Sequence, residues 1–180
     1  SILHANKRHQ ILRQGEPFKV SNLDAERNRI SELMKDNGFY YFQPQHVVFR
    51  ADTLQRPLNV QLQVRPQPNL PETAKRQYYI GKTLISIKRN NEFTTTDTIG
   101  QGEVKMAYYG NGKPPLKMGA ARRFLFYKKG DLYHHRQHST IQEILSGMGI
   151  FYALRMNYVP RDTSATNDTL DVFINATLDK

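Results

Sequence analysis

Three histidines stand close together in the second half of the sequence, as His134, His135 and His138. Histidine is the commonest metal ligand in proteins, and the last two would lie near one another on a helix. A metal site needs a third ligand and groups that orient the ligands, and no carboxylate falls at convincing spacing nearby. The chain also has no cysteine. We therefore predict a solvated basic helix start here and no metal site.

The other residues that suggest catalysis have simpler explanations. The glycines of residues 100–102, GQG, are too closely spaced for a dinucleotide fingerprint and precede a strand-like run. Asp24, Glu26 and Glu32 fit helix capping and surface ion pairs better than acid–base chemistry. No Ser-His-Asp set stands out. The sequence therefore predicts a protein that is not an enzyme and holds no cofactor.

Charge and composition limit the class of partner. The 180 residues carry a formal net charge of +10, so nucleic acid, an anionic membrane surface and acidic proteins are all candidates. The sequence contains no apolar run of about 18 residues, the length that a membrane-spanning helix needs. The first residues, SILHANKRHQ, read as the interior of a longer chain, so the lack of a leader does not argue for the cytoplasm.

A helix is predicted over residues 22–37. Apolar residues at helical spacing share one face of it, namely Leu23, Ile30, Leu33 and Met34. Ser21 and Asp24 form a capping-box pattern at its start, and Asn37-Gly38 supplies a left-handed residue at its end.

The hydrophobic period then changes from 3.6 to 2. An aromatic and β-branched row follows, made of Tyr40, Phe42, Val47 and Phe49 and interrupted by Pro44. Because proline cannot donate to a ladder, we expect an edge strand or a bulge here. A turn over residues 52–57 leads to a second strand, in which Val60, Leu62 and Val64 alternate with polar residues.

The second half repeats this order. Ser139 and Gln142 form a capping-box pattern, an apolar helical face follows, and Gly147 or Gly149 ends the helix. Residues 150–160 and 170–178 then alternate as two strands joined by a polar turn. A shorter helical segment closed by a glycine, Gly15 or Gly130, precedes each long helix.

The repetition predicts tandem copies of one unit. Each copy reads as a β-α-α-β-β module of the α+β class, a three-stranded mixed sheet with two helices on one face. The first module covers residues 1–72 and shows no opening strand. The second covers residues 73–180, opens with the strand YYIGKTLISIK at residues 78–88, and carries an insertion at about 89–118. The proline-rich segment PQPNLPETAK, residues 66–75, joins the two.

The ordered combination of these features resembles the POTRA domains of BamA- and TamA-type outer-membrane proteins. The segment GEPFKVSNLDAERNRISELMKDNGFYYFQPQHVVFRADT is most similar to the TamA-like surface-antigen proteins of Bacteroidota, and YKKGDLYHHRQHSTIQEILSGMGIFYALRMNYVP is a weaker match. The resemblance implies a soluble arm on the periplasmic face of a Gram-negative outer membrane, N-terminal to a β-barrel. Such an arm receives unfolded outer-membrane proteins or accessory periplasmic proteins and helps their insertion or export.

Strand addition is the mechanism that this fold suggests. An uncovered sheet edge offers unpaired N–H and C=O groups to an extended client, whatever its sequence. The predicted partner-binding edge strands contain twelve residues: Gln45, His46, Val47, Val48, Phe49, Arg50, Ala153, Leu154, Arg155, Met156, Asn157 and Tyr158. The alternative is that both strands are structural and covered by a neighbouring module.

Two other functions stay open at this point. RRFLFYKK, residues 122–129, is a basic patch with interleaved aromatics, as in nucleic-acid-binding modules, although we expect at least two of residues 124–126 to be buried in a short helix. The chain would otherwise be a passive spacer for a membrane barrel. Its basic residues would face anionic lipid headgroups or water.

Overall fold

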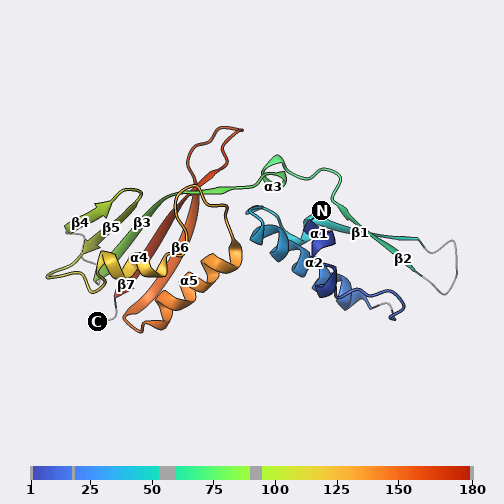
Figure 1. Cartoon of the computed structure of the whole chain (residues 1–180), viewed down its shortest axis with the longest axis horizontal. Helices are drawn as coiled ribbons and strands as arrows, with labels where there is room; N and C mark the ends of the chain where they lie inside the picture. Colours follow the sequence, from blue (N-terminus) through green and yellow to red (C-terminus); the bar gives the residue numbers. More distant parts are fainter. Residues whose placement is uncertain (1, 18, 53–59, 90–94, 179–180) are drawn as a thin grey trace. The chain divides into compact units, whose positions relative to one another are not determined.

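The computed structural model describes residues 2–17, 19–52, 60–89 and 95–178 (Figure 1). The chain divides into two compact units, Ser1–Gln77 and Tyr78–Lys180, which we call unit 1 and unit 2. The boundary expected from the sequence, between residues 72 and 73, lies a few residues before this division. Most of the turn predicted over residues 52–57 lies outside the described residues.

Unit 1 packs one long helix against a two-stranded sheet. Its elements are α1 (Ile2–Ala5), η1 (Lys7–His9), α2 (Val20–Asp36), η2 (Pro44–His46), β1 (Val47–Asp52), β2 (Gln61–Pro66) and α3 (Glu72–Lys75). β1 and β2 are antiparallel, and Val47 pairs with Pro66. The core is small: Ile30, Phe42 and Val47 are buried, and half-buried apolar side chains such as Leu3 pack around them.

α2 begins and ends by different means. Its end matches the prediction, because Gly38 has a φ of 91° and the Asn37 side chain donates to the Leu33 carbonyl at 2.8 Å. Its start does not. The helix begins at Val20 after Lys19, which makes no side-chain capping bond, and Ser21 lies inside the helix. The predicted capping box is therefore wrong.

The aromatic cluster after Gly38 does not begin a strand. Pro44 opens the short turn η2 instead, since its fixed φ suits the first helical position and its missing N–H is not needed there. The His46 ring Nδ1 accepts from the Gln43 N–H at 3.0 Å and holds this turn. Gln45 and His46 therefore lie in a helical turn, and the predicted edge strand begins only at Val47.

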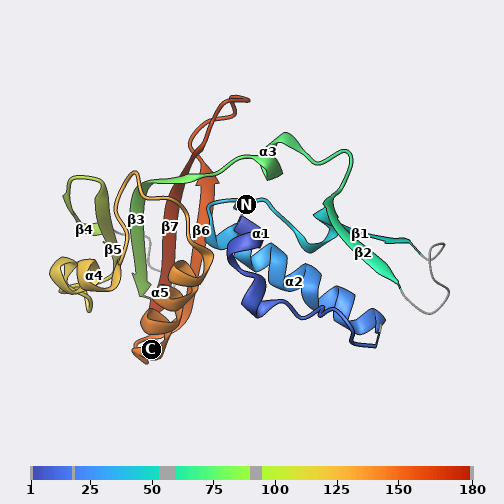
Figure 2. The same cartoon turned by 45° about the vertical axis from the view of Figure 1, so that its right-hand side comes forward.

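Unit 2 contains the predicted order β-α-α-β-β with an added hairpin. Its elements are β3 (Tyr79–Arg89), β4 (Thr95–Gln101), β5 (Val104–Tyr109), α4 (Met118–Phe124), α5 (His135–Gly147), β6 (Phe151–Pro160) and β7 (Thr169–Leu178). The sheet order is β4-β5-β3-β7-β6, as Figure 2 shows. β3 runs parallel to both β5 and β7, and β6 is antiparallel to β7. The insertion therefore extends the expected three strands to five.

Alternation builds the core of unit 2. The even-numbered residues of β7, Leu170, Val172, Ile174, Ala176 and Leu178, are at most 5 % exposed. Ile85 of β3 pairs with both Ile174 and Met106, which puts these three buried side chains on one face of the sheet. Ile141 and Leu145 of α5 are also buried.

Two sequence expectations about the helices of unit 2 are wrong. α5 begins at His135, with His134 as its N-cap, so Ser139 lies inside the helix and does not cap it. α4 ends at Phe124, which leaves Leu125 and Phe126 outside it. Phe126 is 51 % exposed, and neither Phe124 nor Leu125 is fully buried.

Candidate strand-accepting edges

β6 forms one edge of the five-stranded sheet. It pairs with β7 on one side, and no strand within the described ranges lies on its other side. Leu154, Met156 and Tyr158 are half-buried, whereas Ala153, Arg155 and Asn157 are exposed. The strand thus alternates as predicted from Ala153 to Tyr158, after a register shift against β7 between Phe151 and Ala153, and its outer backbone edge faces no other described strand.

A hydrogen bond links this edge strand to helix α5 behind it. The Tyr158 hydroxyl lies 2.6 Å from Nδ1 of His138 on α5. Tyr133 packs edge-on against Tyr158, with ring centroids 5.3 Å apart. Tyr158 therefore serves to position β6, and the stretch before it, residues 153–157, is the better candidate for accepting a partner.

His138 lies in an aromatic cage. Its ring stacks on Tyr127 at 4.5 Å and lies 5.2 Å from the Tyr133 ring. Burial, reinforced by the nearby His134 and His135, lowers the pKa of His138 to about 4. Its Nε2 has no hydrogen-bond partner in the described part of the chain. The ring is thus neutral at physiological pH and serves as an acceptor or donor for Tyr158 according to its tautomer.

The three histidines of the HHxxH run have separate structural roles. His134 caps α5 by accepting from the Gln137 N–H at 3.3 Å, and Nδ1 of His135 lies 2.9 Å from the Tyr133 hydroxyl. Over the described residues, no group of three histidine or carboxylate side chains is placed to hold a metal ion. Sequence reasoning treated this run as a solvated surface and missed the buried His138.

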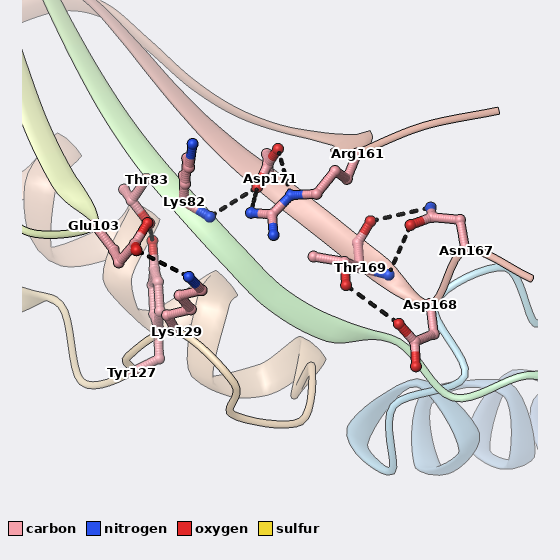
Figure 3. Close-up of polar contacts among 10 residues, drawn as sticks. All are labelled: Lys82, Thr83, Glu103, Tyr127, Lys129, Arg161, Asn167, Asp168, Thr169 and Asp171. Atoms are coloured by element: carbon pink, nitrogen blue, oxygen red, sulfur yellow. Dashed lines mark hydrogen bonds and ion pairs between the residues drawn. The ribbon is translucent and has the colours of Figure 1, made fainter. Parts of the chain in front are cut away.

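Ion pairs fix the end of the sheet from which β6 leads into β7 (Figure 3). Asp171 accepts from Arg161 Nη2 and from the Lys82 backbone N–H, both at 2.7 Å. Burial raises the pKa of Asp171, but these hydrogen bonds outweigh it and hold the pKa below its ordinary value. Gly81 lies beside them, and a Cβ there would clash with Asp171 and Arg161. β3 is therefore tied to the turn that follows β6.

A second tie lies beside it. Lys129 contacts Glu103 at 2.8 Å, and this hydrogen bond lowers the pKa of Glu103. The Thr83 and Tyr127 hydroxyls lie 3.0 Å apart, and burial raises the pKa of Tyr127 to about 12. Tyr127 also stacks on His138, so these contacts join β3 to the cage behind β6.

β1 of unit 1 is the second predicted edge. It pairs only with β2 among the described strands, and Val48 and Arg50 are exposed. Part of its backbone is already engaged, because Arg27 Nε donates to the Val47 carbonyl at 3.2 Å. The Arg27 guanidinium also lies 5.4 Å from the centroid of the Phe49 ring. This edge is therefore shorter and less accessible than β6.

Sequence reasoning missed a cavity beside β2. It has a volume of about 270 Å³ and is lined mainly by apolar side chains, among them Leu3, Ile30, Phe42 and Val64. Val64 is 41 % exposed although its pairing partner, Phe49, packs against the core. The alternation of Val60, Leu62 and Val64 predicted an apolar face on this strand. It did not indicate that this face would remain partly exposed and border a cavity.

The position of Glu26 also differs from the surface ion pair that we expected from the sequence. It is 2 % exposed, pairs with Arg29 at 2.6 Å and accepts the Ile11 backbone N–H at 2.9 Å. Glu26 therefore links the segment before α2 to the helix by buried and half-buried contacts. Its spacing from Leu23 and Ile30 places it on the apolar face of α2, which is the signal that identifies it.

No helix in the described ranges has the length and apolar character to cross a bilayer. No protein-family model matches the sequence, and neither does any curated protein.

Comparison with solved structures gives the fold. The chain aligns with BamA from Haemophilus ducreyi lacking POTRA domains 1–3, with a TM-score of 0.59 at 14 % identity, over 98 % of this chain and 27 % of that one. It aligns with POTRA domains 3–5 of Haemophilus influenzae BamA with a TM-score of 0.55 at 12 % identity, over 97 % of this chain and 55 % of that one. The predicted α+β architecture is confirmed, and this chain has the fold of POTRA domains.

Proposed function

We propose that the chain is the periplasmic arm of an outer-membrane protein assembly or translocation machine, anchored by a barrel elsewhere in its parent protein. Its partners are unfolded outer-membrane proteins or accessory periplasmic proteins, bound without catalysis by β-strand addition. The likeness in fold to the POTRA domains of BamA supports this role. The TamA-like subtype of Bacteroidota is part of the proposal and depends on the sequence segment around NGFYYF.

The edge of β6 is the observation that carries the proposal. It runs for ten residues, Phe151–Pro160, and pairs with β7 alone among the described strands. An incoming strand would pair with residues 153–157 and gain main-chain hydrogen bonds that do not depend on its sequence. Tyr152 and Val159 are 79 % and 46 % exposed, which adds apolar surface at both ends of this stretch. The edge of β1 provides a shorter second site.

Two proline substitutions in β6 test the mechanism. Successive N–H groups along a strand point to opposite sides, so one of Arg155 and Met156 directs its N–H to β7 and the other directs it outward. Arg155→Pro and Met156→Pro thus form a matched pair. We expect one variant to lose stability. The other should stay folded and bind an unfolded outer-membrane protein segment about tenfold more weakly.

Hydrogen exchange on the free protein shows which amide is which, and titration with the segment gives the affinity. Unchanged binding in the folded variant contradicts strand addition at β6. Arg155→Ala, which keeps the backbone N–H, is the control for the loss of side-chain charge and should bind like the original protein.

A secondary part of the proposal is that exposed basic residues in and near α4 contact an anionic membrane surface. Arg123, Lys128 and the 51 % exposed Phe126 are able to face an anionic lipid surface, where each charge is worth about 1 kcal/mol. The sequence led us to expect Phe126 to be buried. Its exposure instead is what a side chain that contacts a membrane interface would show.

A further inference from the structure

We propose that Asn111, in the loop between β5 and α4, is a site of spontaneous covalent modification. Its side-chain amide closes a ring with the backbone nitrogen of Gly112, and water opens the resulting cyclic imide to aspartate or isoaspartate. The site lies away from the sheet edges of the proposed function and depends on no partner.

The reaction needs no reactant other than water. The Gly112 nitrogen loses its proton and attacks Cγ of Asn111, so that a new N–C bond forms. The bond from Cγ to Nδ2 breaks, and Nδ2 takes up the displaced proton and leaves as ammonia. Water then attacks the imide. Attack at Cγ gives aspartate, and attack at the main-chain carbonyl carbon gives isoaspartate.

The chain contains an internal comparison for this chemistry. The pair Asn-Gly occurs twice in the sequence, at residues 37–38 and 111–112. Because glycine has no side chain to hinder ring closure, both pairs are reactive in an unfolded chain. A difference in rate between them in the folded protein therefore comes from the structure around each pair.

The folded structure blocks the first pair. Asn37 Nδ2 donates to the Leu33 carbonyl at 2.8 Å, which directs the amide back along α2. The Gly38 N–H, the group that must lose its proton, donates to the Lys35 carbonyl at 3.2 Å. Asn37 is half-buried and Gly38 is buried. Ring closure here requires both hydrogen bonds to break and the end of α2 to open.

The second pair is not held in this way. Asn111 and Gly112 are both exposed and lie in a bend outside any helix or strand. Among the described residues, neither the Asn111 side chain nor the Gly112 N–H has a hydrogen-bond partner. A Cβ placed on Gly112 would meet no atom within 4 Å. The attacking nitrogen and the amide therefore have room to close the ring without unfolding.

The modification changes the contact that this loop makes with the sheet. The buried Tyr108 donates its hydroxyl to the Asn111 carbonyl at 3.3 Å and accepts from Arg89 Nε at 3.4 Å. In isoaspartate the main chain runs through Cβ and is longer, and the former carbonyl carbon carries a carboxylate. The acceptor of the Tyr108 hydroxyl thus becomes negatively charged, and the formal net charge falls by one from +10.

The test follows both asparagines in the same molecule. The full chain is incubated in neutral buffer and digested at intervals, and mass spectrometry quantifies the gain of about 1 Da at each site. We expect residue 111 to convert at least about tenfold faster than residue 37, because only the latter needs local opening. An isoaspartate-specific carboxyl methyltransferase should label the peptide that contains residue 111.

Incubation in guanidinium chloride separates structure from sequence. Unfolding removes the hydrogen bonds of Asn37 and Gly38, so the two sites should then convert at similar rates. Equal rates in the folded protein would overturn the proposal. So would a lack of conversion at residue 111, or a difference that persists in the denaturant.

Two variants act as controls. Asn111→Gln must close a larger and less favourable ring, so its residue 111 should stay unmodified, and the exposed position keeps the fold. Asn111→Asp adds the charge without lengthening the main chain. We expect hydrogen exchange in the loop, residues 110–117, to be faster in the aged chain than in fresh protein and unchanged in Asn111→Asp. Unchanged exchange in the aged chain would contradict the inferred change at Tyr108.

Discussion

The last strands of the two units, β2 and β7, differ in what they bury. Both follow an antiparallel partner, and both alternate apolar with polar residues. In β7 the alternation yields a fully buried row, whereas in β2 Leu62 is half-buried and Val64 is 41 % exposed. The difference lies in the neighbours, because β7 has a strand on each side and β2 has one described partner. An apolar pattern thus becomes a core only when the adjacent strands are present.

The stabilising contacts differ accordingly. Unit 2 relies on close-packed isoleucines and leucines, and its buried polar side chains, such as Thr83 and His138, contact hydroxyls. Unit 1 has a small apolar cluster and depends more on polar contacts, among them those of Glu26 with Arg29 and the Ile11 N–H and the hydrogen bond from the Ser31 hydroxyl to the Phe42 carbonyl. We expect unit 1 to be the less stable of the two.

The largest expected difference in unfolding free energy comes from truncating one side chain on each of the equivalent strands β7 and β2. Ile174→Ala removes a side chain that is 0 % exposed and should cost about 2–5 kcal/mol of unfolding free energy. Val64→Ala, on the equivalent strand of unit 1, should cost less than about 0.5 kcal/mol. Denaturant unfolding monitored by hydrogen exchange in each unit measures both. Equal losses of unfolding free energy in the two variants would contradict the difference in burial between β2 and β7.

The pH dependence of the unfolding free energy compares the two buried histidines, His138 of unit 2 and His46 of unit 1. The pKa of His138 is lowered to about 4 from an ordinary 6.5, so between these values the unfolded chain binds a proton that the folded chain does not. The contribution of His138 is therefore fully present above pH 6.5 and is lost as the pH falls to 4, by about 3 kcal/mol in total.

His46 in unit 1 follows the same sign, because burial lowers its pKa and its Nδ1 must stay unprotonated to accept the Gln43 N–H. Unfolding free energies measured at several pH values, with His138→Phe and His46→Phe as separate controls, assign the slope. A slope that persists in His138→Phe would contradict the role of the aromatic cage.

The smallest effect concerns the bulge in β3, the strand that has no described counterpart in unit 1. The register of β3 against β7 shifts between Ile80 and Thr83, and a Cβ at Gly81 would meet Asp171 and Arg161. Gly81→Ala should cost about 1–3 kcal/mol.

Gly119→Ala is the matched control, since no atom lies within 4 Å of a Cβ placed there, in α4. It should be neutral or stabilise by up to about 1 kcal/mol. Thermal unfolding of the two variants measures the difference, and a harmless Gly81→Ala would show that the Asp171 contacts do not hold the bulge.

Much of the fold follows from local patterns. The alternation of residues 170–178 predicted a strand, and the buried row of β7 confirms it. The Asn37-Gly38 pair predicted the end of α2, and the positive φ of Gly38 confirms it. The residues around Pro44 were harder, since one proline suits either a strand edge or the first position of a helical turn, and the His46 contact with Gln43 favours the turn.

The candidate sites were predicted less completely. Residues 153–157 lie on a sheet edge as expected, whereas Gln45 and His46 lie in a turn and Val47 is partly engaged by Arg27. The cavity beside Val64 and the cage around His138 join residues far apart in the sequence. No spacing rule connects Tyr127, His138 and Tyr158 before the chain folds.

The sequence by itself determined the order of helices and strands, their hydrophobic faces and several of their ends, because these depend on periodicity and on the φ that a glycine or proline allows. Only the tertiary structure decided that β5 would pair beside β3, that Tyr127 and Tyr158 would pack around His138, and that Val64 would stay exposed. Those outcomes depend on which strands become neighbours, and neighbours are chosen by packing across the whole unit and not by any local pattern.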